Sequence, residues 1–244
     1  MPETSLNEKI DTENKCDLHP SEFLPCCVCD EHKEYRKQNE IRRKEKEKQM
    51  IESRFESIGL GDRYKKCSFE NYKASCECAS EIMLMCLRYA ETFRERRRDG
   101  DCLALLGNLG TGKNHLAAAI CRVVHSAGYT VVHTTTMRMI RYVRRAYQSS
   151  DISEQDQIDS LVVPDLLVLD EIGVNRGTDD ELVLLSDVIC SRIENYKPVI
   201  LVSNLSLTDL AKYVGDRVID RLYDGNSNVL CFTWESYRRR DRQE

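Results

Sequence analysis

Short apolar runs alternate with longer amphipathic segments along most of this chain. The runs are rich in aliphatic and β-branched residues, and they cover residues 102–106, 129–134, 166–169 and 198–203. Runs of this kind predict buried strands. Helical periodicity marks segments between them, at residues 76–98, 116–121, 136–147 and 180–195. Strands that alternate with helices predict an α/β fold with a parallel sheet.

The N-terminal quarter differs in composition and predicts two further parts of the chain. Residues 1–32 are polar and contain closely spaced cysteines and histidines, whereas residues 33–61 are rich in Lys, Arg, Glu and Gln. Opposite charges at helical spacing in the second part predict a charged helical linker. A solvated connecting helix is the first interpretation, and a helix that binds a partner or DNA is the alternative. Residues 62–244 then form the α/β core.

A glycine-rich loop connects the first apolar run to the next helix. Its residues are Gly107, Asn108, Leu109, Gly110, Thr111, Gly112, Lys113 and Asn114. Glycine adopts backbone angles that other residues resist, so successive N–H groups of such a loop can surround a phosphate. The positive end of the following helix and the Lys113 ammonium add to that field. The pattern predicts a nucleotide site rather than a glycine turn that binds nothing.

Asn114 departs from the usual form of this loop, in which a Ser or Thr hydroxyl after the lysine holds magnesium. The amide oxygen of Asn114 can also ligate Mg²⁺, but less favourably. We therefore expect binding of ATP with Mg²⁺, and slow hydrolysis.

Acidic and polar residues follow the third and fourth apolar runs. Asp170 and Glu171 come directly after residues 166–169, and Asn204 follows residues 198–203. The carboxyl ends of parallel strands meet at one edge of a sheet, beside the phosphate site. We expect Asp170 to hold Mg²⁺, directly or through water, and Glu171 to orient the attacking water. Asn204 either contacts the γ-phosphate or caps the end of its strand.

The segment 136–147 combines cations with aromatic side chains. Its arginines are Arg138, Arg141, Arg144 and Arg145, and its tyrosines are Tyr142 and Tyr147. Arginine neutralises phosphate and tyrosine stacks on bases, so the pattern is typical of a contact with a single nucleic-acid strand. A basic surface helix without a ligand is the alternative.

Two pairs of metal-ligating residue types lie near the N-terminus. The favoured ligands are Cys16, His19, Cys26 and Cys29, with Cys27 or His32 as substitutes. Each pair encloses two residues, a spacing that suits tetrahedral Zn²⁺. The alternative is a disordered tail that contains reduced cysteines.

Composition adds constraints on location and redox chemistry. The chain has 244 residues, a formal net charge of −5 and 12 cysteines. No apolar run is long enough to span a membrane and no apolar signal segment is visible, so we expect a cytoplasmic protein with reduced thiols and no membrane partner. The mildly negative charge argues against a basic nucleic-acid coat protein. Cysteines within apolar runs are expected in the core, and these are Cys86, Cys102, Cys121, Cys190 and Cys231.

Residues 67–238 resemble the DnaC-type bacterial replicative helicase loaders, which are AAA+ ATPases related to the initiator DnaA, to DnaI and to IstB-like transposition ATPases. The matching segments are 67–72, 110–120, 169–173 and 234–238. The resemblance implies an AAA+ P-loop core with a five-stranded parallel sheet flanked by helices, without a separate helical lid. DnaC-type loaders share the pair of Lys113 and Asn114, and the adjoining His115 belongs to the same matching segment.

The resemblance also implies a role for each matching residue. Lys113 is similar to the Walker A lysine, and Asp170 and Glu171 are similar to the Walker B pair. Asn204 is similar to the first sensor. Arg221 is similar to the arginine finger that reaches the nucleotide of a neighbouring subunit.

Further expectations concern partners. Arg238 is similar to the second sensor, and the segment 136–147 lies where this group carries a helical element that lines a path for single-stranded DNA. The N-terminal region is similar to loader regions that bind zinc and dock on the helicase. We therefore expect a loader that delivers a DnaB-type replicative helicase onto single-stranded DNA and assembles into a spiral with ATP. The alternatives are an IstB-like transposition regulator and a nucleotide-sensing adaptor without significant hydrolysis.

Overall fold

The computed structural model describes Lys37 and residues 64–148, 153–174, 177–223 and 228–237. The chain divides into two units, Met1–Arg54 and Phe55–Glu244, and every element described below belongs to the second unit. The predicted zinc ligands, most of the charged linker and Arg238 lie outside the described residues. The domain boundaries expected from the sequence remain predictions.

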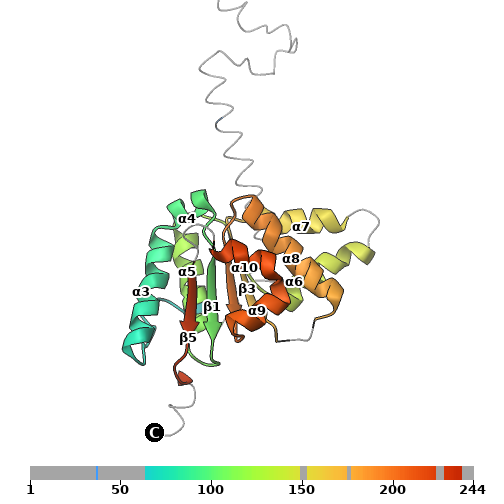
Figure 1. Cartoon of the computed structure of the whole chain (residues 1–244). Helices are drawn as coiled ribbons and strands as arrows, with labels where there is room; N and C mark the ends of the chain where they lie inside the picture. The colour runs from blue at the N-terminus through green and yellow to red at the C-terminus, as the bar shows by residue number, and fades with distance from the viewer. Residues whose placement is uncertain (1–36, 38–63, 149–152, 175–176, 224–227, 238–244) are drawn as a thin grey trace, which may run out of the picture. The chain divides into compact units, whose positions relative to one another are not determined.

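Within the described residues, five parallel strands form one sheet in the order β2-β3-β4-β1-β5 (Figure 1). Their bounds are β1 Leu103–Gly107, β2 Val131–Thr135, β3 Leu166–Ile172, β4 Val199–Ser203 and β5 Asn228–Phe232. β3, β4 and β1 occupy the middle of the sheet. Burial on both faces explains why these three strands are almost entirely apolar. The predicted five-stranded parallel sheet is therefore confirmed.

Helices cover both faces of this sheet (Figure 1). The helices are α3 Glu77–Glu91, α4 Phe93–Asp99, α5 Lys113–Ser126, α6 Thr136–Arg144, α7 Glu154–Val162, α8 Asp179–Glu194, α9 Leu207–Val214 and α10 Asp216–Tyr223, with 3₁₀ turns η1 Tyr64–Lys66 and η2 Arg145–Gln148. α3 and α5 pack on alternate strand residues such as Leu105, Val168 and Val202. On the other face, α8 contacts β4 and α10 contacts β5. The core therefore consists of two apolar layers, one on each side of the sheet.

A fully buried arginine joins two loops at the amino end of the sheet. Arg192, on α8, donates hydrogen bonds to the carbonyls of Leu161 at 2.7 Å, Pro164 at 3.0 Å and Pro198 at 2.9 Å. Its planar guanidinium supplies several N–H donors in fixed directions, which suits carbonyls from separate segments. Burial lowers the pKa of Arg192 to about 9. These bonds tie the end of α7 to the starts of β3 and β4.

Some elements differ from the sequence-based expectations. Residues 76–98 form two helices, α3 and α4, because Thr92 leaves the helical conformation between them. The expected core position is correct for Cys86, Cys102 and Cys121. Cys190 is half-buried, and the prediction is wrong for Cys231, which is exposed because β5 is an edge strand.

Candidate nucleotide-binding site

A cleft of about 900 Å³ lies beside the glycine-rich loop, at the carboxyl ends of the central strands. The loop forms one wall, and the ends of β3 and β4 contribute Asp170, Glu171 and Asn204. The segment before α3 and the chain after β5 complete the lining. The structure therefore brings the predicted phosphate loop, acidic pair and sensor residue together at one site.

Three glycines determine the conformation of the loop. Gly107, Gly110 and Gly112 have positive φ angles of 118°, 75° and 99°, a region that favours glycine. Close packing adds a second requirement at Gly112, where an added Cβ would lie 2.7 Å from Cε2 of Tyr72. The loop conformation therefore depends on these glycines, as the sequence predicted.

Hydrogen bonds from residues in other parts of the cleft lining hold the carbonyl groups of the loop. Trp234 Nε1 and the Tyr72 hydroxyl donate to the carbonyl of Thr111 at 3.1 and 3.3 Å. The backbone N–H of Tyr237 donates to the carbonyl of Gly110 at 3.0 Å. These bonds fix the conformation of the loop in the protein itself. A glycine-rich loop held in one conformation before a helix N-terminus suits an anion.

Lys113 begins α5 and is almost fully buried. Its ammonium donates to the carbonyls of Gly107 at 2.8 Å and Asn108 at 2.5 Å. Burial lowers the pKa of Lys113 to about 8, although the nearby Asp170 opposes this change. An anionic phosphate oxygen is a stronger partner for an ammonium than a carbonyl is. The side chain is therefore placed to exchange its carbonyl partners for a bound phosphate.

The two acidic residues lie in different environments. Asp170 is buried, which raises its pKa to about 6, and it accepts a hydrogen bond of 2.7 Å from the backbone N–H of Glu171. Glu171 is exposed, and its φ of 59° is unusual for a residue other than glycine. A buried carboxylate requires donors or a cation, whereas an exposed one can exchange protons with water. The geometry suits metal binding by Asp170 and water activation by Glu171.

Asn114 lies between Asp170 and Tyr64. Its side-chain nitrogen donates to the Asp170 carboxylate and to the Tyr64 hydroxyl, the latter at 3.2 Å. Carboxylate and amide oxygens are ligand types that Mg²⁺ accepts in proteins, so Asn114 and Asp170 together fit this ion. Tyr64 was not expected at the site, because its link to Asn114 joins residues 50 positions apart, which no spacing rule reveals.

Two further predicted residues, Asn204 and His115, also line the cleft. Asn204 is exposed, directly after β4. The preceding Ser203 donates to the carbonyl of Ile172 at 2.7 Å, which ties the ends of β3 and β4 together. A ring nitrogen of His115 lies 2.8 Å from the carbonyl of Ser68. His115 therefore holds the segment before α3 against the phosphate loop.

Three of the four arginines expected to contact DNA are exposed. Arg138 and Arg141 lie on α6, and Arg145 follows in η2. Spacings of three and four residues place these side chains on one helical face. Arg144 instead donates to Glu181 at 3.0 Å and links α6 to α8. A DNA contact by any of the four stays a prediction.

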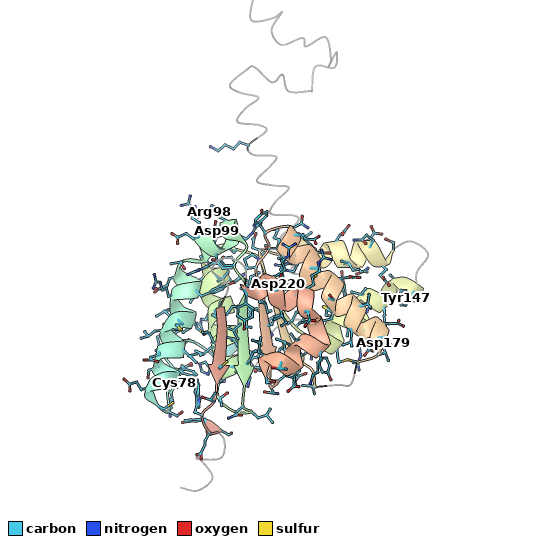
Figure 2. The ribbon with its side chains drawn as sticks, viewed as in Figure 1. Cys78, Arg98, Asp99, Tyr147, Asp179 and Asp220 are labelled. Carbon is cyan, nitrogen blue, oxygen red and sulfur yellow. The ribbon has the colours of Figure 1, made fainter. Side chains whose placement is uncertain are left out.

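The aromatic residues of the same segment differ from expectation. Tyr142 is buried, and its hydroxyl shares a hydrogen bond of 2.8 Å with Ser160 of α7, so its expected availability for base stacking is wrong. Tyr147 is exposed and projects from the surface (Figure 2). At the other end of α6, the hydroxyl of Thr136 donates to the carbonyl of Asp170 at 3.2 Å. The first turn of α6 therefore lies directly beside the nucleotide cleft.

Arg221 does not belong to the cleft of its own subunit. It is exposed on α10 and is not among the residues that line the site, and Arg238 lies outside the described ranges. Within those ranges, no three His, Cys, Asp or Glu side chains are grouped to hold a metal ion. The predicted zinc ligands are not covered by that observation. No helix in the described part of the chain has the length and apolar character to cross a membrane.

Comparison with known proteins identifies the family. The family model described as "IstB-like ATP binding protein" matches residues 87–244. The chain belongs to this family. The matched region of this IstB-like protein contains the phosphate loop and the strand ends that line the cleft.

Curated relatives of this IstB-like protein include DnaC proteins. It is 34% identical over 188 residues to "Replicative helicase loader DnaC" of Escherichia coli K12, with 76% of this chain and 75% of that protein covered. The DnaC of Buchnera aphidicola subsp. Schizaphis graminum is 33% identical, with 74% of this chain and 72% of that protein covered. "Uncharacterized protein YdaV" of Escherichia coli K12 is 31% identical, with coverages of 77% and 74%. The resemblance to the DnaC-type group is confirmed.

Solved structures agree on the fold. The crystal structure of the DnaC helicase loader superposes with a TM-score of 0.62 at 24% identity and covers 70% of this chain and 99% of that chain. AMPPCP-bound DnaA from Aquifex aeolicus has a TM-score of 0.59 at 19% identity, with coverages of 73% and 53%. At these identities the likeness shows the fold alone. The expected AAA+ core is confirmed.

Proposed function

We propose that this IstB-like protein is an ATP-controlled loader that delivers a DnaB-type replicative helicase onto single-stranded DNA when replication begins. The observation that carries the proposal is the cleft that gathers Lys113, Asn114 and Asp170. It occurs in a chain 34% identical to a protein named Replicative helicase loader DnaC. The phosphate loop supplies the nucleotide dependence, and the relatives supply the partner class.

Each residue of the cleft has a role in this proposal. Lys113 contacts the terminal phosphates of ATP, and Asn204 contacts the γ-phosphate or aligns water. Asp170 and Asn114 hold Mg²⁺, which neutralises phosphate charge when bound. Glu171 orients the attacking water and accepts its proton. Hydrolysis is slow because an amide replaces the hydroxyl that usually follows the lysine.

Assembly completes both the nucleotide site and the DNA site. ATP favours a spiral in which Arg221 reaches the nucleotide of the neighbouring subunit, and its exposure outside its own cleft supports that role. Arg138, Arg141 and Arg145 line a path for single-stranded DNA, because their shared face offers cations to successive phosphates. Arg238 acts as a second sensor. Hydrolysis then releases the loader from the helicase.

The test is an assay of helicase delivery onto single-stranded DNA that is coated with single-stranded DNA-binding protein. Lys113→Ala removes the ammonium from the cleft, and we expect loss of both ATP binding and helicase delivery. Lys212→Ala is the matched control, because Lys212 is exposed on α9 and pairs with Asp209, one turn earlier in the same helix. Normal delivery by Lys113→Ala would overturn the proposal.

The N-terminal region is proposed to bind one Zn²⁺ and to dock on the helicase. Elemental analysis of the purified full chain tests the first part. Replacement of Cys16 and Cys26 by Ser should remove zinc and reduce co-purification with helicase, while ATP binding remains. If wild-type protein purified without zinc still binds helicase, the proposed zinc site is refuted.

A transposition regulator is the second candidate, favoured by the IstB-like family description. Competitive pull-down with a replicative helicase and an IS21-type transposase separates the two candidates. A nucleotide-sensing adaptor without useful hydrolysis is the third, and Asn114 is the observation that favours it. Equal ATPase rates for wild type and Glu171→Gln, measured with DNA and helicase present, would support the adaptor.

A further inference from the structure

Asn114 stands where an ordinary phosphate loop has a hydroxyl, and its hydrogen bonds show how an amide can replace that group. A Ser or Thr hydroxyl at this position can ligate the metal and donate its proton to an acceptor with one atom. An amide divides the same two tasks between its oxygen and its nitrogen. The Asn114 nitrogen donates to the Asp170 carboxylate, which leaves the amide oxygen as the available metal ligand.

Because the two tasks fall on different atoms, the Asn114 amide must be held in one orientation. A carboxylate only accepts hydrogen bonds, so Asp170 determines which end of the Asn114 amide faces it. That single contact does not stop the side chain from rotating about the bond and carrying its oxygen away from the metal. A second fixed partner for the amide nitrogen would restrain this rotation. The Tyr64 hydroxyl is such a partner, at 3.2 Å from the same nitrogen.

Tyr64 is itself held by the protein core. Its ring packs against the ring of His133, with centroids 5.6 Å apart and planes inclined by 45°. His133 is buried on β2, and η1, which begins with Tyr64, packs against α5. The hydroxyl therefore has a defined position before any ligand binds, as expected of groups that orient metal ligands.

We propose that Tyr64 is a positioning residue that holds the Asn114 amide with its oxygen toward the metal and its nitrogen toward Asp170. The proposal rests on the proposed binding of a nucleotide with Mg²⁺. It assigns a role to a residue outside the phosphate loop and outside the acidic strand. It also explains how this chain retains a metal site without the usual hydroxyl.

The test replaces Tyr64 by Phe, which keeps the ring on His133 and removes only the hydroxyl. Mn²⁺ replaces Mg²⁺ so that electron paramagnetic resonance reports the free ion directly in the presence of ADP. We expect Mn²⁺ affinity to fall about tenfold, as for other partners of metal ligands. Affinity for a fluorescent ATP analogue in EDTA should not change, because the hydroxyl's hydrogen bond is to the Asn114 side chain. Tyr196→Phe is the matched control, since Tyr196 is exposed before β4.

A second background isolates the route through Asn114. In Asn114→Ser the hydroxyl again performs both tasks with one atom, so adding Tyr64→Phe should have no further effect on Mn²⁺ affinity. A thermal melt of each variant confirms that it is folded.

The outcomes separate this inference from the proposed function. Equal Mn²⁺ affinities for wild type and Tyr64→Phe would overturn the positioning role and leave the proposed function intact. So would an equal loss in the Asn114→Ser background, or a loss of metal-free nucleotide affinity, since either result means that Tyr64 acts elsewhere in the cleft. A wild-type protein that binds no nucleotide with or without metal would instead overturn the proposed function.

Discussion

Burial of a charged lysine makes the phosphate loop costly to fold. Lys113 is 4% exposed, and burial lowers its pKa from 10.5 to about 8. At pH values where Lys113 is charged in both the folded and the unfolded protein, this difference in pKa destabilises the folded state by about 3 kcal/mol. Lys113→Met keeps an apolar stem of similar length and removes the charge. The variant should therefore lose ATP binding and also lose this cost.

The pH dependence isolates the charge from the hydrogen bonds that the substitution also removes. Between the folded pKa of about 8 and the unfolded value of 10.5, the unfolded state binds more protons, so wild-type stability rises with pH. From about pH 7 to about pH 9 the wild type should gain about 1.4 kcal/mol relative to Lys113→Met. Below the folded pKa the full cost remains, and above the unfolded pKa it disappears.

Urea unfolding of both proteins at the two pH values, without nucleotide and at constant ionic strength, measures this gain. Titrating groups that do not interact with Lys113 cancel in the difference between the variants, whereas Asp170, whose pKa Lys113 lowers, does not. Lys212→Met, at an exposed position, should show no such change relative to wild type. If the stabilities of wild type and Lys113→Met change in parallel with pH, then burial does not destabilise the charged form of Lys113 and the reasoning is refuted.

Three further predictions follow from the site and the core. Glu171→Gln should retain ATP affinity but lower DNA- and helicase-stimulated hydrolysis about 100-fold, measured by phosphate release, because it removes the group that accepts a proton from water. Replacing Arg138 and Arg141 by Ala should weaken single-stranded DNA binding and reduce the slope of log affinity against log salt by about 0.7 for each arginine. The control Arg98→Ala, on α4, should leave that slope unchanged. Identical slopes for wild type and the double variant would reject a contact with phosphate. Arg192→Met should destabilise the protein by about 1–3 kcal/mol in urea unfolding, because it leaves buried carbonyls without donors. A loss below about 1 kcal/mol would show that these loops are held by other contacts.

The sequence predicted the phosphate loop and the central strands well because their signals are local. Gly107, Gly110 and Gly112 must adopt backbone angles that few other residues tolerate. Likewise residues 166–169 of β3 and 199–202 of β4 are all apolar because both faces of the sheet are covered there. Asp170 and Asn204 then follow from the rule that parallel strands end at one edge.

The remaining features depend on contacts that no local pattern encodes. β5 was not identified from its own residues, and Cys231 within it is exposed. Arg192 looks like a solvent-facing cation on an amphipathic helix, yet the carbonyls of two distant loops bury it. Tyr64 reaches the site only through the packing of η1 on α5, so its role becomes visible only in three dimensions.

The hydrogen bond between the Thr136 hydroxyl and the carbonyl of Asp170 connects α6 directly to the acidic end of β3. That carbonyl belongs to the peptide that leads into Glu171. A bound DNA strand that pulled the first turn of α6 outward would either break this hydrogen bond or rotate the Asp170 peptide. If α6 binds single-stranded DNA as proposed, tension on the strand would reach Glu171, the proposed base, through this one bond and without passing through the rest of the sheet.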